Sequence, residues 1–402
     1  MIIKLQKKIY LPDSEVVTLV IRRINIFACK LLTLSVIGVL FYTEYLIDDG
    51  SSSQVTVNPK KRRIFMKRLC ALFVVLAFIA TAGFAVAGTL DDVKAKGVIS
   101  VGVNEGLAGF SKPDEKGEWH GLDVDTARAI SSAVFGAPDK LKFVPLTAKT
   151  RFTALQSGEI DVLTRNCTQT LGRETALGLN FVHVNYYDGQ GFLVPKKLGV
   201  KSAKELDGAT VCVLPGTTTE LNLADYFRAN NMKMKPVVIE STPELAKAFF
   251  AGRCDVLTSD ASQLASTRSV APNPDDYIIL PEIISKEPLA PVVRHGDDQW
   301  YDIVNFSVLA MIAAEELGIT SKNVDEMLKS EDPKIQRFLG VSPGNGKALG
   351  LDEKWAYNII KQVGNYGEVF DRNVGVNTPL KLERGLNAQW NKGGIMYSPP
   401  FK

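Results

Sequence analysis

From residue 98 onward, short apolar runs alternate with longer amphipathic segments, and this alternation predicts a first folding module. The apolar runs that have the length of buried strands are 98–103, 141–145 and 160–163. The segments between them, 121–135 and 151–157, repeat their apolar residues at helical spacing. An order of strand, helix, strand, helix, strand predicts a parallel sheet with right-handed crossovers.

The same plan recurs in a second module, without a repeat of the sequence itself. Its predicted strands are 210–214, 236–239 and 255–257. Its predicted helices begin in the turn PGTTTE and at residue 243. In both modules polar residues stand at the carboxyl ends of the strands, which is the edge where open α/β sheets bind ligands.

Two extended segments, 189–195 and 286–294, connect the modules. The chain would therefore leave a first lobe, build a second and return, and a predicted helix at 300–317 would pack on the first lobe. We expect a cleft between two lobes that opens and closes about the crossovers. The end of the chain predicts a helix at 353–370 and a loop-rich tail whose aromatic residues cover a groove on the body.

Charge is unevenly distributed along the chain. The formal net charge is +3, but residues 1–87 hold 12 of the 47 Lys and Arg and only 5 of the 44 Asp and Glu. The remainder is net acidic and gives no electrostatic footprint for a nucleic acid. A length of 402 residues with 46% hydrophobic content fits a globular protein of two or three domains.

Residues 66–87 have the pattern of a secretory signal peptide. Lys67 and Arg68 precede an apolar run at 69–84, and the sequence AVA at 85–87 is a cleavage site of the A-x-A type. A transmembrane anchor is the alternative, but the run is short for a span. We therefore expect a secreted protein that begins at residue 88.

Residues 1–65 precede this signal, although a signal peptide acts at the N-terminus. We interpret them as a non-native upstream extension of the reading frame. Their apolar segment 27–47 leaves open a less favoured alternative, in which the chain is a sensor domain tethered to a membrane.

Three cysteines remain after residue 87: Cys167, Cys212 and Cys254. In an oxidising compartment two of them can pair and one is left over. Cys212 and Cys254 both lie near the start of predicted buried strands, so a bridge between them is possible if those strands are neighbours. Three buried free thiols are the alternative.

The strongest candidate site is the sequence GEIDVLTRNCTQTLGRE at 158–174. An apolar run ends there in small polar residues and leads into a predicted helix, with Thr168 and Thr170 as N-cap candidates. Free N–H groups at a helix start favour an anion, and Arg173 adds a planar donor that matches a carboxylate. We expect a small ligand with a carboxylate, unless Arg173 is a solvated or surface ion-paired side chain.

A second stretch in the other module complements the first. The turn Gly216-Thr217-Thr218 gives another helix start with hydroxyl and N–H groups, and Asp260 ends a predicted strand as a lone carboxylate. A carboxylate suits an ammonium group, so Arg173 and Asp260 on opposite sides of a cleft would hold both ends of a zwitterion. The predicted ligand is an α-amino acid.

The motifs VGVNEGLAGF, GLDVD, GEIDVLTRNCTQTLGRE, VLPGTTTE and GRCDVLTSD, in this order, resemble the periplasmic solute-binding proteins of polar amino-acid ABC transporters. The crossover NYYDGQGFLVPK and the C-terminal extension resemble the general L-amino acid permease branch of solute-binding protein family 3. The resemblance extends from Thr89 to the C-terminus. It implies the two-lobed type II periplasmic-binding-protein fold, in which each lobe is a parallel or mixed sheet flanked by helices and two crossover strands form the hinge.

Together, these observations predict a domain organisation of six segments. They are the extension 1–65, the signal peptide 66–87, the first part of lobe 1 at 88–193, lobe 2 at 194–287, the return to lobe 1 at 288–345, and a C-terminal extension at 346–402 that packs on the body.

The resemblance also implies roles for the residues around the α-groups of the ligand. Arg173 matches the arginine that pairs with the α-carboxylate, and Thr168 and Thr218 match further contacts of that group. Asp260 matches the carboxylate that binds the α-ammonium group, and Asn166 is the small polar residue beside it.

For the ligand side chain, the resemblance places Asn104 and Leu107 on a loop of lobe 1 that lines the pocket. Leu107 stands where binders of basic amino acids have an aromatic residue, which disfavours a cationic ligand. Arg165 replaces a residue that is usually small and uncharged, and it favours acidic or amide ligands unless it forms a salt bridge away from the cleft. Thr217, in the turn of the second lobe, completes the set of candidate binding residues.

The function implied is broad binding of L-amino acids and delivery to an inner-membrane ABC permease with its cytoplasmic ATPase, by a periplasmic monomer that needs no metal or cofactor. An enzyme similar to cyclohexadienyl dehydratase on the same fold is the other alternative. The histidines His120, His183 and His295 form no spaced pair, and no zinc or nucleophile motif occurs. We therefore expect a binding protein without catalytic activity.

Overall fold

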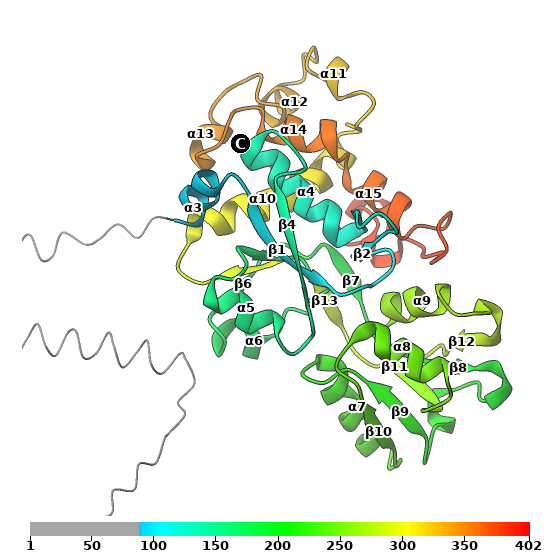
Figure 1. The fold of residues 1–402 in the computed structure, drawn as a ribbon. Helices are drawn as coiled ribbons and strands as arrows, with labels where there is room; N and C mark the ends of the chain where they lie inside the picture. The colour runs from blue at the N-terminus through cyan, green and yellow to red at the C-terminus, as the bar shows by residue number, and fades with distance from the viewer. Residues whose placement is uncertain (1–87) are drawn as a thin grey trace, which may run out of the picture. The chain divides into compact units, whose positions relative to one another are not determined.

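The computed structural model describes residues 88–402, in which two five-stranded sheets are each flanked by helices (Figure 1). The predicted signal peptide and upstream extension lie outside the described residues. No helix between residues 88 and 402 combines the length and the apolar character that crossing a membrane requires.

The first sheet is mixed and has the strand order β4-β1-β5-β14-β6. Its strands are β1 (Ile99–Asn104), β4 (Leu141–Leu146), β5 (Val162–Leu163), β6 (Leu179–Phe181) and β14 (Val292–Arg294). β1 is parallel to β4 and β5, as the first module predicts, whereas β14 is antiparallel to both β5 and β6. The elements of this lobe before the crossover also include α3 (Thr89–Lys96), β2 (Lys112–Pro113), β3 (Trp119–His120), α4 (Leu122–Phe135), α5 (Arg151–Ser157) and α6 (Leu171–Thr175).

The second sheet has the order β10-β9-β11-β8-β12 and repeats the architecture of the first. Its strands are β8 (Gln190–Pro195), β9 (Thr210–Val213), β10 (Lys235–Val238), β11 (Val256–Asp260) and β12 (Tyr277–Ile279), and its helices are α7 (Thr218–Ala229), α8 (Thr242–Phe250) and α9 (Ala261–Ser269). β9 is parallel to β10 and β11, and β8 is antiparallel to β11 and β12. The two-lobed α/β fold with mixed sheets is therefore confirmed.

The first crossover differs from the prediction. The segment 189–195, expected to connect the lobes, forms β8 inside the second sheet, where its backbone pairs with β11 and β12. The connection lies earlier, at β7 (Tyr186–Asp188), which pairs antiparallel with β13 (Glu287–Leu289) from the returning chain. The continuous apolar character of 191–194 is that of a strand buried on both faces, and all four of these residues are buried.

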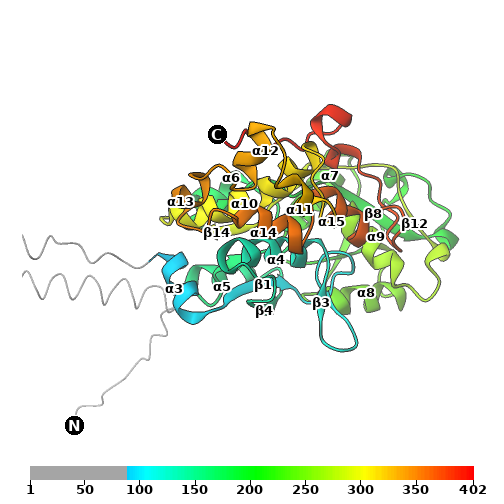
Figure 2. The same ribbon diagram turned by 90° about the horizontal axis from the view of Figure 1, so that it is seen from above.

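The end of the chain packs on the first lobe. The helix expected at 353–370 is divided into α14 (Trp355–Gln362) and α15 (Tyr366–Asn373). The break occurs because Gly364 has φ of +95° and Asn365 starts a new helix with a capping box to Glu368. Figure 2 shows α14 beside α4 and α10 (Asp298–Glu316), which it contacts. The remaining helices of this region are α11 (Val324–Met327), α12 (Pro333–Phe338) and α13 (Asn345–Leu349).

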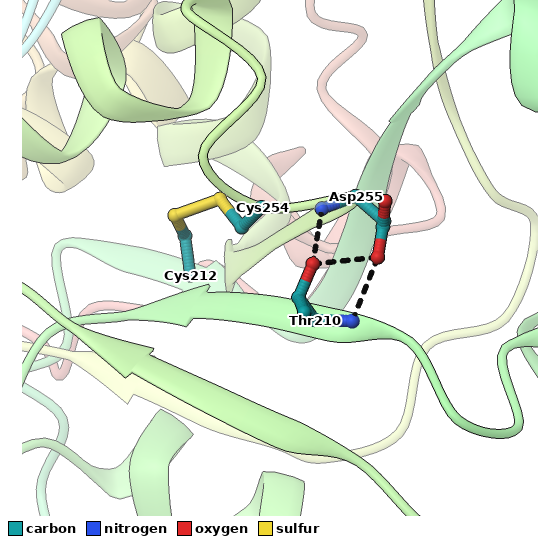
Figure 3. The surroundings of a disulfide bond; sticks show 4 residues. All are labelled: Thr210, Cys212, Cys254 and Asp255. Atoms are coloured by element: carbon teal, nitrogen blue, oxygen red, sulfur yellow. Dashed lines mark hydrogen bonds between the residues drawn. A yellow bond between two sulfur atoms is a disulfide. The ribbon is translucent and has the colours of Figure 1, made fainter.

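A disulfide bond joins Cys212 in β9 to Cys254 just before β11, with 5.7 Å between the Cα atoms, so the possible pairing is confirmed (Figure 3). Next to it, the Asp255 carboxylate accepts hydrogen bonds from the backbone N–H and the hydroxyl of Thr210. Cys167 is a buried free thiol. The covalent bond and the hydrogen bonds hold the starts of two adjacent parallel strands together.

Candidate functional site

A small cavity lies where the carboxyl ends of β5 and β11 approach the start of α7. It is lined by Ala148, Arg151, Arg165, Asn166, Thr168, Leu214, Thr217, Thr218, Thr219, Ser259, Asp260 and Gln263. Both lobes therefore contribute to one site, at the edge of each sheet where open α/β sheets bind ligands.

Asp260 places a buried carboxylate at the cavity. It is the last residue of β11, is 5% exposed, and has no ion-pair partner within 4.0 Å among residues 88–402. Burial raises its pKa well above the usual value, and the neighbouring carboxylates of Asp188 and Glu287 raise it further. An ammonium group bound here would supply the missing counter-charge.

Arg173 lies next to the cavity but is not among the residues that line it. Its Nη1 donates to the backbone oxygen of Thr168 at 2.6 Å, and its guanidinium lies 5.1 Å from the ring centre of Phe152. Burial, followed by repulsion from Arg151, lowers its pKa to about 10. Thr170 is the N-cap of α6 and accepts from the backbone N–H of Arg173, so of the two N-cap candidates it is Thr170 that caps this five-residue helix.

Two other arginines do line the cavity. Arg165 is 2% exposed and donates from Nε to the backbone oxygen of Leu146 at 2.8 Å, and Arg151 is 3% exposed at the start of α5. Arg165 Nη2 and Arg151 Nε are buried without a hydrogen-bond partner among the described residues. Arg165 forms no salt bridge with any residue between 88 and 402, so the alternative that it is ion-paired away from the cleft does not hold there.

The two guanidinium groups also repel each other. Burial, followed by the charge of Arg151, lowers the pKa of Arg165 to about 9. Buried cations with unused donors are costly unless an anion or acceptor joins them. The cavity is therefore suited to a ligand that carries acceptor oxygens in addition to an ammonium group.

Hydroxyl groups from both lobes meet at the cavity. Thr168 follows β5 and Thr218 starts α7, and their Oγ1 atoms are 3.4 Å apart. Both donate to Oε2 of Glu287, from 2.5 Å and 2.8 Å. Thr217 is the N-cap of α7: its Oγ1 accepts from the N–H of Glu220 and donates to the backbone oxygen of Leu214.

Asn166 links the two lobes on another side of the cavity. It has a positive φ of 23°, which an asparagine tolerates better than most residues. Its Nδ2 donates to Oε1 of Gln263 in the second lobe at 3.3 Å, and its backbone N–H donates to the Asp123 carboxylate at 3.1 Å. Asn104 at the end of β1 donates to Oδ1 of Asn166 at 3.4 Å but does not line the cavity.

Leu107 is also separate from the cavity. It is 2% exposed, belongs to the core cluster of the first lobe, and its N–H donates to the backbone oxygen of Ser111. Six of the nine predicted binding residues therefore line the cavity, and Arg173, Asn104 and Leu107 lie beside it.

Several lining residues were missed by the sequence analysis, notably Arg151, Ser259 and Gln263. A signal for Arg151 existed, because it starts the predicted helix 151–157 that follows a strand, and Arg173 lies in the first turn of the helix that follows the next strand. Ser259 lies within the LTSD motif. A lone glutamine on a helix such as Gln263 carries no signal of its own.

These features define a class: a two-lobed binding protein whose cleft presents both a buried carboxylate and buried arginines. The chain belongs to the bacterial extracellular solute-binding proteins, family 3, whose family model matches residues 99–323. It is 61% identical to the general L-amino acid-binding periplasmic protein AapJ of Rhizobium johnstonii, over 82% of this chain and 96% of that protein.

Two further comparisons agree. The chain is 58% identical to the glutamate/glutamine/aspartate/asparagine-binding protein BztA of Rhodobacter capsulatus, over 80% of this chain and 95% of that protein. Among solved structures, an ABC transporter periplasmic binding protein from Brucella ovis with glutathione bound has a TM-score of 0.77 and 57% identity, covering 79% of this chain and all of that one.

Proposed function

We propose that this protein binds L-amino acids in the periplasm and delivers them to an ABC-type membrane permease. The observation that carries the proposal is the cavity in which the buried Asp260 carboxylate and the buried guanidinium groups of Arg151 and Arg165 face the same small space. A zwitterion with a further acidic or amide group supplies a partner for each of them.

The α-groups of the ligand are the constant part of this recognition. Asp260 takes the α-ammonium group, and the α-carboxylate takes donors from Arg173 and from the N–H groups at the start of α7. Glutathione, bound by the Brucella relative, carries a free α-ammonium and α-carboxylate on its glutamyl residue, so its binding there supports the same pair of contacts.

The side chain of the ligand is the variable part. Arg165 and Arg151 favour an acidic or amide side chain because both present donors that lack partners among the described residues. The names of the two relatives, one for general L-amino acids and one for glutamate, glutamine, aspartate and asparagine, support a broad range of ligands with this preference.

In this proposal the cleft binds an amino acid for transport and does not catalyse a reaction. The relatives are named as binding proteins of transport systems, which supports an ABC permease with its ATPase as the partner and the periplasm as the location. We propose a monomeric carrier in which lobe 2 begins with β8, rather than at residue 194, and lobe 1 resumes after β13, with the extension at 346–402. The closed, loaded form is presented to the permease.

A thermal-shift screen tests this function. Protein that begins at Gly88 is unfolded and refolded to remove carried-over ligand, then heated with each L-amino acid, several D-enantiomers and α-amides. Ligand at about 100 times Kd adds roughly 2.7 kcal/mol of stability. Stabilisation by many L-amino acids but not by D-forms or amides supports the proposal, whereas no response to any L-amino acid contradicts it.

A further inference from the structure

Glu287 is a buried carboxylate in the crossover that returns the chain to the first lobe. It is the first residue of β13, is 1% exposed, and stands opposite Asp188 in the β7–β13 pair. It makes no ion pair within residues 88–402. A buried carboxylate in such a place must be held by hydrogen bonds.

Four side chains supply those hydrogen bonds. Oε2 accepts from the hydroxyl groups of Thr168 and Thr218, and Oε1 accepts from Nδ2 of Asn222 at 2.8 Å and from the hydroxyl of Ser285 at 2.6 Å. Thr168 belongs to the first lobe, Thr218 and Asn222 to α7 of the second, and Ser285 to the crossover segment. The carboxylate is therefore fixed by donors from both lobes and the connection between them.

The hydrogen bonds also determine the direction of two hydroxyl protons. A threonine hydroxyl has a single proton and two lone pairs. Thr168 and Thr218 both line the cavity, and both give their proton to Glu287. Only their lone pairs remain for a ligand, so these hydroxyl groups can accept a hydrogen bond but not donate one.

We propose that Glu287 is a positioning residue that orients the hydroxyl groups of Thr168 and Thr218 as acceptors, and so makes the cleft select ligands that carry an α-ammonium group. An ammonium group has only donors, so it can donate hydrogen bonds both to the Asp260 carboxylate and to the lone pairs of these two hydroxyl groups. The α-carboxylate is then left to arginine and to backbone N–H groups. This inference rests on the proposed function.

The substitution Glu287→Gln tests the role with little change of shape. A carboxamide has one acceptor oxygen, and its NH₂ group is a donor, so it cannot accept all four hydrogen bonds. At least one hydroxyl must turn its proton elsewhere, and where that hydroxyl belongs to Thr168 or Thr218 the cavity is the open direction. The matched control is Glu282→Gln, because Glu282 lies in the same returning segment but accepts only from Ser202 and Ala203 of the second lobe.

Calorimetric titration of the refolded proteins compares L-glutamate with 2-oxoglutarate, in which a carbonyl replaces the ammonium-bearing carbon. In Glu287→Gln we expect the affinity for L-glutamate to fall about 10- to 100-fold, as when one or two hydrogen bonds to a charged group are lost. The affinity for 2-oxoglutarate should change much less, so the ratio of the affinity for L-glutamate to that for 2-oxoglutarate should fall. This ratio is the preference for the amine. Glu282→Gln should keep the wild-type preference.

Equal losses for both ligands, or no loss, would overturn the inference while leaving the proposed function in place. Wild-type protein that binds no L-amino acid would overturn the function first, and the inference with it. Should Glu287→Gln fail to fold, Thr218→Val replaces one of the two hydroxyl groups by a methyl group of similar size. That variant should narrow the preference in the same direction by a smaller factor, and an unchanged preference would again overturn the inference.

Discussion

At the scale of single residues, the site combines charges that are unfavourable without a ligand. Asp260 is a buried carboxylate beside Asp188 and Glu287, and Arg151 is a buried guanidinium beside Arg165. Like charges held close together in a buried site raise the free energy of the empty cleft, and a ligand with complementary charges lowers it. The affinity should therefore depend strongly on each charge and weakly on charges at the surface.

Asp260→Asn should weaken binding of every L-amino acid by roughly a thousandfold, because removing one partner of a buried charge pair costs about 3–5 kcal/mol. Titration of several L-amino acids measures the loss. Asp225→Asn is the matched control, since this carboxylate lies in the same lobe with 65% of its side chain exposed. A wild-type titration of the Asp260 variant would contradict the placement of the ammonium group.

Binding should also strengthen as the pH rises from about 5 to 7. Burial raises the pKa of Asp260, and burial raises the pKa of its neighbour Asp188 to about 6, so the ligand-free site retains protons in this range. An ammonium group favours the ionised form, so binding releases protons and the affinity gains up to about tenfold per pH unit. Calorimetry in two buffers of different ionisation enthalpy measures this release. Proton uptake on binding would contradict the expectation.

Arg151→Met should change which side chains are accepted. The variant removes a buried donor group from the cavity while Asp260 remains, so binding of L-glutamate should fall by about 30-fold or more and binding of L-alanine should change much less. Parallel titrations measure the ratio. Arg228→Met serves as the control because that side chain is 80% exposed. Equal losses for both ligands would assign Arg151 to the α-groups instead.

At the scale of elements, the two lobes are built on one plan, and each brings polar strand ends to the cleft. The disulfide bond fixes β9 to the segment that enters β11, the strand that ends at Asp260. The two cysteines are 42 positions apart in the sequence. Closing a loop of that length lowers the entropy of the unfolded chain, so the bond stabilises the second lobe.

The double variant Cys212→Ala, Cys254→Ala should lower the free energy of unfolding by up to about 4 kcal/mol, the value that the chain-entropy model gives for this loop. Urea denaturation measures the change. A reducing agent should bring the wild type down to the level of the double variant and leave the variant unaffected. If the reducing agent has no effect on the wild type, the bond does not contribute in solution.

Much of this organisation could be predicted from the sequence, because strand-length apolar runs and helical spacing report local burial. The parallel strands β1, β4, β9 and β10 are found at the expected positions to within one or two residues. The antiparallel strands were harder to place. β8 lies in the second sheet because its backbone pairs with β11, and nothing in the segment 189–195 specifies that partner.

For the candidate site, residues at the end of a strand or the start of a helix were predictable, and Asp260 and Thr218 are examples. Glu287 was not, because three of its four donors lie 65 to 119 positions away in the sequence and only Ser285 is local. Its burial is produced by tertiary packing alone. Leu107 illustrates the opposite case, since a loop position near the cleft turned its side chain into the core.

At the scale of the whole molecule, the C-terminal extension contacts the crossover as well as the first lobe. The N–H of Tyr187 in β7 donates to Oδ1 of Asn387 at 2.7 Å, and Nδ2 of Asn387 donates back to the oxygen of Tyr187 at 3.1 Å. The ring of Tyr186 stacks on Phe370 of α15. One edge of β7 is therefore paired with the extension, and the other with β13.

Asn387→Ala should loosen β7, since it leaves the N–H and the oxygen of Tyr187 without their side-chain partner. An unsatisfied buried polar group costs about 1–3 kcal/mol, and part of that cost should appear as local opening. Hydrogen exchange at Tyr187 should accelerate, and the free energy of unfolding should fall. Asn377→Ala in the same extension is the control, because this side chain is exposed and makes no hydrogen bond in residues 88–402. If both variants exchange like the wild type at Tyr187, β13 alone holds β7, and the extension does not stabilise the crossover.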